Sequence, residues 1–495
     1  MIRKAFICLL ISLVYSQNCK LDVTRLSHLE KNLKLNTQKI LEKKIGEENA
    51  ALFMGTARAG KSTLINYIIN NKLKATKKNQ FEPILIEKAD KKSSGPQIGR
   101  GSKSKTTIPS KWKSPKLPKL VLWDTPGFDD NRGNEQDITN SYYIKFLIDN
   151  LQSLKFIVVI DFDDLKNDSP NPFFTLLRHL EDIFQKDFQN IFSSISVIFA
   201  KAPEIWNNYT VDHEFIKEKL KMQFLSSSQM ELSEKKKKFI LYLIDNVNHT
   251  GIFRRAMRIG EVTSDVDYNI FPAIRNSVSL QRTFLQHLKV SVSDASNLCL
   301  QNIASELKTM IRVSMYNLLN AMLQVVTTMK KNDLIAIKNE SYANYIRTFQ
   351  KKVIVIKEEL SLSGNHTRTL YSTVEAISLM DNKFKLIIDE NNILEKIKIL
   401  AFIDDLLHTQ VIEDLEHYLF DILKWLHESV NETISDVDRM ISDAKKENNK
   451  LDNKDLKLTH TEKEISYSKW DAIIGAFQIF IGKKSLGDIT NLHIT

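Results

Sequence analysis

Cysteine is scarce in this sequence, and the second half of the chain has almost no proline or glycine. There are three cysteines among 495 residues. Cys8 lies in an apolar N-terminal run, and the other two, Cys19 and Cys299, have neither metal-binding nor redox spacing. A disulfide-rich scaffold and a cysteine-based metal or redox site are therefore excluded, whereas two free thiols and a single bridge both remain open.

The distribution of proline and glycine divides the chain in two. All ten prolines lie at or before Pro272, and Gly364 is the only glycine between residues 273 and 474. A stretch that lacks these residues and is rich in Leu, Ile, Lys and Glu is typical of long helices. We therefore expect a domain boundary near residues 272–282, followed by an all-α region.

Apolar runs in the sequence are too short to cross a membrane, which takes about 20 residues. The run Ala5–Tyr15 follows Ile2-Arg3-Lys4 and precedes the small Ser16, as in a secretory signal peptide. Entry into the secretory pathway is expected, and a cytosolic or peripheral membrane protein with a buried N-terminal element is the alternative. Ala472–Ile481 is expected to dock as a terminal helix or strand. In the lumen, Asn-x-Ser/Thr sites would be open to glycosylation at Asn208, Asn248, Asn339, Asn365 and Asn431.

Charges of both signs occur throughout the chain, with 70 Lys and Arg against 60 Asp and Glu and a formal net charge of +10. The excess would favour anionic partners such as phosphates or acidic lipid head groups, but charges of both signs spread throughout the chain favour a solvated basic surface instead. The basic stretch Lys88–Lys119 lacks interleaved aromatic residues for base stacking. We expect no nucleic-acid partner, and a membrane surface remains a candidate partner.

Short apolar runs alternate with helical patterns over the first 275 residues. The predicted strands are Ala51–Met54, Ile84–Ile86, Lys119–Trp123, Phe156–Ile160, Ile195–Phe199 and Phe239–Ile244. The predicted helices are Ser62–Asn71, Thr139–Gln152, Phe173–Phe192 and His213–Phe224. Because strands and helices alternate, the sequence predicts an α/β domain with a mostly parallel sheet covered by helices on both faces.

Beyond residue 275, apolar residues recur every three or four positions. One stripe runs from Leu300 to Val325 and a second from Ile412 to Ile441. They predict an antiparallel helical bundle or stalk, and a compact helical domain without a mechanical role is the alternative. The predicted organisation is a signal-peptide-like segment 1–16, a helical lead-in 17–48, an α/β domain 49–275, a helical domain 276–445, and an exposed charged linker with an apolar tail 446–495.

The motif Gly55-Thr-Ala-Arg-Ala-Gly60-Lys61-Ser62 lies between a predicted strand and a predicted helix. Its glycines let backbone N–H groups point at phosphate oxygens, and the following helix N-terminus adds its dipole. In such a P-loop the lysine neutralises the β- and γ-phosphates and the serine hydroxyl binds Mg²⁺. The predicted nucleotide-binding residues of this loop are Gly55, Arg58, Ala59, Gly60, Lys61, Ser62 and Thr63.

A second phosphate-binding element is predicted at the end of a later strand, in Asp124-Thr-Pro-Gly127. An acidic residue beside a P-loop can hold the Mg²⁺ shell, and the N–H of Gly127 can contact a γ-phosphate. An Asp-x-x-Gly sequence alone is a common turn. Together with the P-loop it indicates a γ-phosphate sensor.

These two motifs resemble those of the large GTPase class that includes septins, immunity-associated (GIMAP-type) GTPases, guanylate-binding proteins and atlastins, over residues 50 to about 270. The resemblance implies a P-loop G domain that binds GTP and Mg²⁺. It also implies a switch threonine between the motifs, for which Thr106 is the first candidate and Thr107 the second. Ser62, Thr106 and Asp124 are thus the predicted metal ligands.

An arginine inside the P-loop is similar to the pattern of guanylate-binding proteins and atlastins, where it can act as an arginine finger in cis. Arg58 and Thr106 are therefore the predicted catalytic residues, and a solvated or ion-paired Arg58 is the alternative. Proline within Asp124-Thr-Pro-Gly127 fits septins and GIMAP-type proteins better, which leaves the subclass open. Phe128 stands where small signalling GTPases have a water-orienting glutamine. Slow hydrolysis is expected, aided by another group or by a partner such as a second G domain in a homodimer.

Of the expected features of the nucleotide site, recognition of the base has the weakest support in the sequence. The resemblance implies Asn/Thr-Lys-x-Asp after Ile195–Phe199, but the sequence has Ala200-Lys201-Ala202-Pro203. Lys201 can stack on a base, whereas Pro203 cannot accept the N–H donors of guanine. GTP preference therefore rests on the resemblance, and ATP remains open. Asp161, Asp163 and Asp164 follow another strand at this edge and either approach Mg²⁺ or form a solvated loop.

The sequence as a whole predicts a Mg²⁺-dependent GTP-binding protein with slow hydrolysis. Its nucleotide state is expected to switch loops near Thr106 and Gly127 and thereby to act on the helical domain or on self-association. Two alternatives are an ATPase on the same fold and a non-hydrolysing scaffold in which nucleotide is structural.

Overall fold

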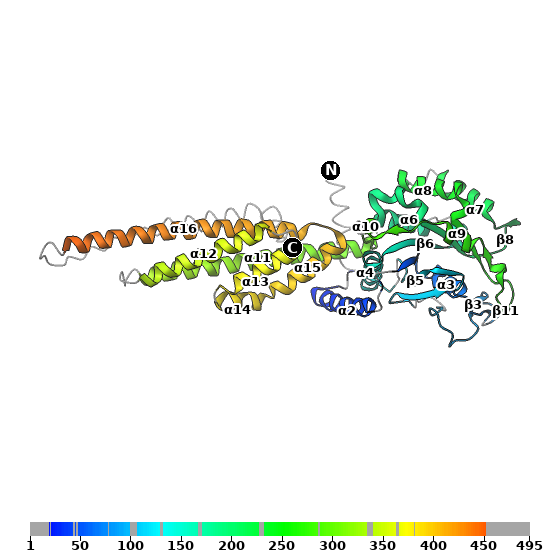
Figure 1. The fold of residues 1–495 in the computed structure, drawn as a ribbon, viewed down its shortest axis with the longest axis horizontal. Helices are drawn as coiled ribbons and strands as arrows, with labels where there is room; N and C mark the ends of the chain where they lie inside the picture. The colour runs from blue at the N-terminus through cyan, green and yellow to red at the C-terminus, as the bar shows by residue number, and fades with distance from the viewer. Residues whose placement is uncertain are drawn as a thin grey trace, which may run out of the picture.

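The computed structural model describes residues 19, 21–42, 45, 48–77, 79–99, 106–128, 132–166, 171–226, 232–285, 288–333, 340–362, 366–380 and 382–451. They form an α/β domain followed by an elongated helical arm (Figure 1). This is the fold class that the sequence predicts. The signal-peptide-like segment, Ala472–Ile481, Asn339 and Asn365 lie outside the described residues.

An eight-stranded mixed sheet forms the centre of the α/β domain. Its strand order is β12-β10-β7-β6-β1-β5-β4, with β13 also paired to β6. The five strands from β10 to β5 are parallel, whereas β4, β12 and β13 pair antiparallel with their neighbours. The strands are β1 (Asn49–Met54), β4 (Ser110–Ser114), β5 (Leu117–Asp124), β6 (Ser153–Asp161), β7 (Ile195–Ala202), β10 (Thr250–Arg254), β12 (Asp267–Tyr268) and β13 (Leu280–Gln281). Because β13 belongs to the sheet, the α/β domain continues beyond residue 275.

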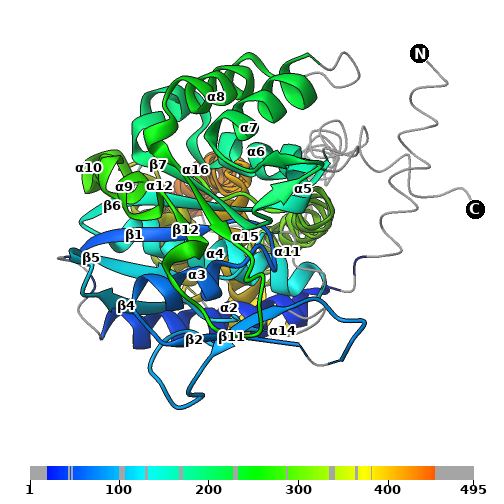
Figure 2. The same ribbon diagram turned by 90° about the vertical axis from the view of Figure 1, so that its right-hand side faces the viewer.

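Helices cover both faces of the sheet, because the central strands are apolar on both sides. In β1, Leu52 packs into one core and Phe53 into the other. The first core is covered by α4 (Asn134–Asn150), α6 (Asn171–Phe184), α7 (His213–Leu220) and α8 (Glu234–Asp245) and continues into the helical arm. The second is covered by α3 (Lys61–Ile68) and α9 (Ile270–Asn276). Figure 2 shows this layering end-on.

Two predicted strands differ from the structure. Phe239–Ile244 is part of α8, so the predicted strand there is wrong. The Ser233 hydroxyl accepts a hydrogen bond from the N–H of Lys236 and caps this helix, whose apolar run is too short to reveal its period. Ile84–Ile86 overlaps β3 (Leu85–Lys88), which lies in a separate three-stranded sheet with β2 (Leu73–Thr76) and β11 (Gly260–Glu261). A two-stranded sheet joins β8 (Ile205–Trp206) to β9 (Tyr209–Thr210).

The predicted helix Phe173–Phe192 is also shorter than expected. After α6, a 3-10 helix spans Gln185–Ser194. Gln185 adopts a left-handed conformation with φ 47°, which ends the α-helical path at Phe184. Short α5 (Phe162–Lys166) precedes α6, and α10 (Arg282–Leu285) follows β13.

The helical arm contains α11 (Asp294–Asp333), α12 (Glu340–Leu362), α13 (His366–Ser378), α14 (Asn382–Asn391), α15 (Ile393–Leu407) and α16 (Val411–Leu451). The two predicted apolar stripes lie on α11 and α16, which also contact each other. Residues 446–451, which we expected in an exposed loop, continue α16, since Lys and Glu favour helix when charges are solvated. Among the described residues, none of the helices combines the length and apolarity that crossing a membrane demands.

The lead-in helix α2 (Val23–Leu41) joins the two regions. It contacts both α4 and α15. The Asn36 amide donates to the Tyr143 hydroxyl over 3.1 Å, and the Ser27 hydroxyl donates to Glu395 Oε1 over 2.5 Å. A disulfide ties Cys19, just before α2, to Cys299 in α11, with 5.6 Å between the Cα atoms. Of the two thiol states left open by the sequence, the structure has the bridge.

Candidate nucleotide-binding site

The P-loop connects the end of β1 to the start of α3. Gly55 has φ 149°, and a Cβ on it would lie 2.2 Å from the carbonyl oxygen of Val159 in β6. Only glycine fits such a close approach of two backbones. The loop closes on α3 at Gly60, so the N-terminus of this helix faces the loop.

A second backbone contact holds the P-loop against the Asp124–Gly127 segment. The N–H of Ala57 donates to the carbonyl of Phe128 over 3.0 Å, and the N–H of Phe128 donates to the carbonyl of Gly55 over 3.1 Å. A Cβ on Gly127 would lie 2.5 Å from Ala57 N. The two predicted phosphate-binding segments are therefore adjacent, because parallel β1 and β5 bring their carboxyl ends to the same edge.

The three predicted metal ligands converge at this edge. The Ser62 hydroxyl donates to Asp124 Oδ2 over 2.8 Å, and the Thr106 hydroxyl donates to the same oxygen over 3.2 Å. Ser62 Oγ and Thr106 Oγ1 are 3.3 Å apart. Thr107, the second candidate for the switch threonine, is exposed.

The carboxylate of Asp124 is almost fully buried, and burial raises its pKa. Within the described part of the chain, its Oδ1 has no hydrogen-bond partner. A buried oxygen without a partner is unfavourable unless another group satisfies it. Two hydroxyls and a carboxylate with one unsatisfied oxygen suit a hard cation such as Mg²⁺, so the donor set fits the predicted metal. The metal-binding role of these residues stays a prediction.

Lys61 crosses the inside of the P-loop. Its ammonium donates to the carbonyls of Gly55 over 3.1 Å and Thr56 over 2.9 Å, and its side chain is buried. A cavity of roughly 790 Å³ opens beside it, within the usual range for small-molecule sites. The predicted residues that line this cavity are Arg58, Gly60, Lys61, Ser62, Thr63, Thr106, Gly127 and Lys201. Ala59, by contrast, is buried against α3 in the second core.

Arg58 and Phe128 point in different directions. Arg58 has φ 72°, is exposed and lines the cavity. Phe128 is buried, and its ring stacks on His179 with centroids 4.5 Å apart and an angle of 11° between the planes. The cavity thus receives a cationic side chain from the P-loop, while the residue after Gly127 faces the core.

The opposite end of the cavity lies at the carboxyl ends of β6, β7 and β10. Lys201 has φ 60°, and its ammonium forms an ion pair with Asp161 Oδ2 at 2.6 Å. A Cβ on Gly60 would lie 4.0 Å from Lys201 Cε, so this lysine extends over the P-loop. Among the described residues, Asp161 is therefore paired with Lys201 and forms no hydrogen bond with Ser62, Thr106 or Asp124.

Asp163 and Arg255 form a second ion pair at this end, with Oδ1 and the guanidinium 2.8 Å apart. The Arg255 guanidinium also donates to the carbonyl of Lys201. The two side chains are 44% and 38% exposed and line the cavity, so both are available to a ligand. Burial and the neighbouring charge of Asp161 raise the pKa of Asp164, which does not line the cavity, to about 6.

Some of the lining could not be recognised from the sequence. Arg255 follows β10, a strand that the sequence does not predict because Gly251 interrupts its short apolar run. The hairpin of β2 and β3 contributes Thr76, Lys77 and residues 82–87. The sequence indicated this hairpin only by the short apolar run Ile84–Ile86, and that run did not indicate a cavity.

Comparison with known proteins agrees with this geometry. Residues 50–193 match the family model described as 50S ribosome-binding GTPase. No curated protein matches the chain. The match covers the P-loop, the metal-ligand candidates and Gly127, and it indicates that this part of the chain is a P-loop GTPase domain.

Proposed function

We propose that the protein is a Mg²⁺-dependent GTPase of slow turnover whose nucleotide state acts on its helical arm or on self-association. The convergence of Ser62, Thr106 and Asp124 beside Lys61 carries this proposal. Mg²⁺ bound there would neutralise charge on the β- and γ-phosphates. Lys61 would exchange its two P-loop carbonyls for phosphate oxygens, and the N–H of Gly127 would contact the γ-phosphate.

Hydrolysis would depend on Arg58. On the exposed side of the P-loop, its guanidinium can reach charge that develops on the transferring phosphoryl group, which is the role of an arginine finger. Phe128 is buried and cannot orient water, which is consistent with slow turnover. The arginine is similar to the pattern of guanylate-binding proteins and atlastins, whereas the proline before Gly127 is similar to septins and GIMAP-type GTPases.

Guanine would be selected by the ion pair of Asp163 and Arg255. A carboxylate accepts from the N–H groups on the N1 and C2 edge of guanine, and a guanidinium donates to O6 and N7. Adenine places an amino group where guanine has O6, so it opposes the guanidinium donor. This arrangement would replace the carboxylate that is missing at Pro203.

The test is nucleotide titration of the full chain with and without Mg²⁺. We expect tight, Mg²⁺-dependent binding of GTP that excess ATP does not displace, and loss of binding in Lys61→Ala. Displacement by ATP would favour the ATPase alternative, and binding without phosphate release in any oligomeric state would favour a scaffold. Failure of the wild-type protein to bind any nucleoside triphosphate would contradict the proposal.

Self-association through the G domain is part of the proposal. Phe81, Met257 and Ile259 are exposed apolar side chains that lie within three residues of the cavity-lining Glu82 and Ala256 in sequence. Light scattering with GDP and with a non-hydrolysable GTP analogue would detect a nucleotide-dependent dimer. Sedimentation with acidic vesicles in the same two states would test a membrane partner.

The disulfide between Cys19 and Cys299 supports entry into the secretory pathway, because structural disulfides persist in oxidising compartments. The exposed Asn208 and Asn248 would then be open to glycosylation. A mature N-terminus near Gln17, determined by mass spectrometry of the protein from its native source, is the expected result. An intact Met1 with free thiols would favour the cytosolic alternative.

A further inference from the structure

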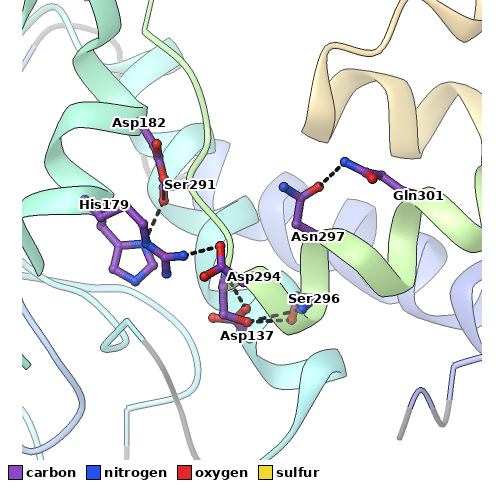
Figure 3. Close-up of polar contacts among 10 residues, drawn as sticks. Asp137, His179, Asp182, Ser291, Asp294, Ser296, Asn297 and Gln301 are labelled. Atoms are coloured by element: carbon purple, nitrogen blue, oxygen red, sulfur yellow. Dashed lines mark hydrogen bonds and ion pairs between the residues drawn. The ribbon is translucent and has the colours of Figure 1, made fainter. Parts of the chain in front are cut away.

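The segment that joins the α/β domain to the helical arm, Ser291–Ser293, is held by buried polar contacts. The Ser291 hydroxyl lies 2.6 Å from His179 Nδ1 and donates to Asp182 Oδ2 over 3.0 Å (Figure 3). Its carbonyl accepts from the Ser141 hydroxyl over 2.7 Å. Ser291 itself is 4% exposed, so these bonds are shielded from water.

The next residues of this connector are fixed in the same way. The N–H of Ser293 donates to Asp137 Oδ2 over 2.9 Å, and Arg178 forms an ion pair with Asp294, the first residue of α11. Figure 3 shows the side chains of Asp137 and Asp294 at the point where the chain enters α11. The connector is therefore held by side chains of α4 and α6.

Those two helices also contact the segment that would sense the γ-phosphate. The Asn140 amide of α4 donates to the carbonyl of Gly127 over 2.9 Å. His179 of α6 stacks on Phe128. Each helix thus touches the Gly127–Phe128 segment and the connector within one or two turns of its length.

A buried polar group that loses its hydrogen-bond partner destabilises the fold. A shift of Gly127–Phe128 that moved Asn140 or His179 would strain the bonds to Ser291 and Ser293. Because protein interiors are tightly packed, such a shift changes the packing to another discrete arrangement and does not deform it gradually.

We propose that Asn140 and His179 are positioning residues that couple Gly127–Phe128 to the connector, so that nucleotide state alters the seating of α11 at Ser291–Ser293. This coupling rests on the proposed function. By linkage, a change at the connector must also alter the preference of the site for one nucleotide state over the other.

The experiment is hydrogen–deuterium exchange of the full chain with GDP or with a non-hydrolysable GTP analogue, both with Mg²⁺. We expect peptides that cover residues 288–300 to exchange differently in the two states. In Ser291→Ala this difference should be lost, and the ratio of the two nucleotide affinities should change by about fivefold or more. Ser141→Ala, which removes the bond to the Ser291 carbonyl, provides a second variant if the first does not fold.

Ser196→Ala is the matched control. Ser196 is a buried serine in the same domain, and its hydroxyl donates to the carbonyl of Ala273 over 2.8 Å, away from the connector. It should lower stability without changing the affinity ratio. Equal exchange at residues 288–300 in the two states, with nucleotide bound, would overturn the coupling alone. Absence of nucleotide binding in the titration itself would overturn the proposed function and the coupling with it.

Discussion

The Ser62 hydroxyl donates to Asp124 Oδ2 over 2.8 Å, which joins the last residue of the P-loop to the end of β5. In this structure the hydroxyl and the carboxylate satisfy each other. Both would have to turn toward a cation for Mg²⁺ to bind between them. The strength of Mg²⁺ binding should therefore depend on the charge of Asp124.

Replacing Asp124 with asparagine should weaken Mg²⁺ binding in the presence of GTP by roughly 10- to 100-fold, because a neutral amide replaces the carboxylate. Burial disfavours the ionised form of Asp124, so the substitution should leave the melting temperature of the ligand-free protein the same or higher. Titration calorimetry and thermal melts measure the two effects. The exposed Asp245→Asn is the control, and an unchanged Mg²⁺ requirement in Asp124→Asn would remove this carboxylate from the metal site.

Replacing Gly127 with alanine should displace the P-loop, because the new Cβ would lie 2.5 Å from Ala57 N. We expect a loss of about 1–3 kcal/mol in the free energy of unfolding and a loss of GTP binding. Denaturant titration measures the loss of stability, and nucleotide titration measures the loss of GTP binding. At Gly133 nothing lies within 4 Å of an added Cβ, so Gly133→Ala should retain GTP binding despite its unfavourable φ of 106°.

Replacing Asp163 with asparagine should change the base preference of the site. Xanthine has a carbonyl oxygen where guanine has its C2 amino group, so an amide donor at residue 163 would suit it better than a carboxylate. The expected result is at least about tenfold weaker GTP binding and improved binding of xanthosine triphosphate. Asp164→Asn, which alters a neighbour outside the cavity lining, should leave the preference unchanged. If Asp163→Asn also leaves it unchanged, guanine is selected elsewhere.

The stability of the protein should depend on pH through Asp164. Its pKa of about 6 exceeds the value near 4 of an unfolded chain, so the folded state keeps a proton that the unfolded state loses. This contribution to stability is present below pH 4 and is lost as pH rises through 6. Asp164→Asn should match the wild type near pH 4 and be more stable at pH 7.5, as measured by denaturant titration. Parallel pH profiles of the two proteins would contradict the assignment.

The parts of the site that the sequence predicted are those fixed by backbone chemistry. A loop that presents N–H groups to phosphate needs glycines at set positions, so Gly55 and Lys61 could be located without a structure. Asp124 followed from its place at the end of a predicted strand of a parallel sheet. Thr106 followed from the resemblance to the large GTPases, which implies a switch threonine between the two motifs. In the helical arm, a stripe repeated over many turns fixed the faces of α11 and α16.

The remaining parts depend on contacts between distant residues. Arg255 enters the cavity only because β10 pairs with β7, and nothing in its local sequence indicates that pairing. The apolar run of α8 became a helix because Ser233 caps it and its buried face packs on the sheet. Ser291 is an ordinary serine in sequence, and only tertiary packing places its hydroxyl beside His179.

The bridge from Cys19 to Cys299 spans 280 residues of sequence and so encloses the entire α/β domain in one covalent ring. The entry and exit of that domain are joined at the base of the arm, independently of any non-covalent contact. A single peptide-bond cleavage inside the ring, even in an exposed loop beside the nucleotide cavity, would open the chain without releasing a fragment. The two pieces would remain one molecule until the disulfide is reduced.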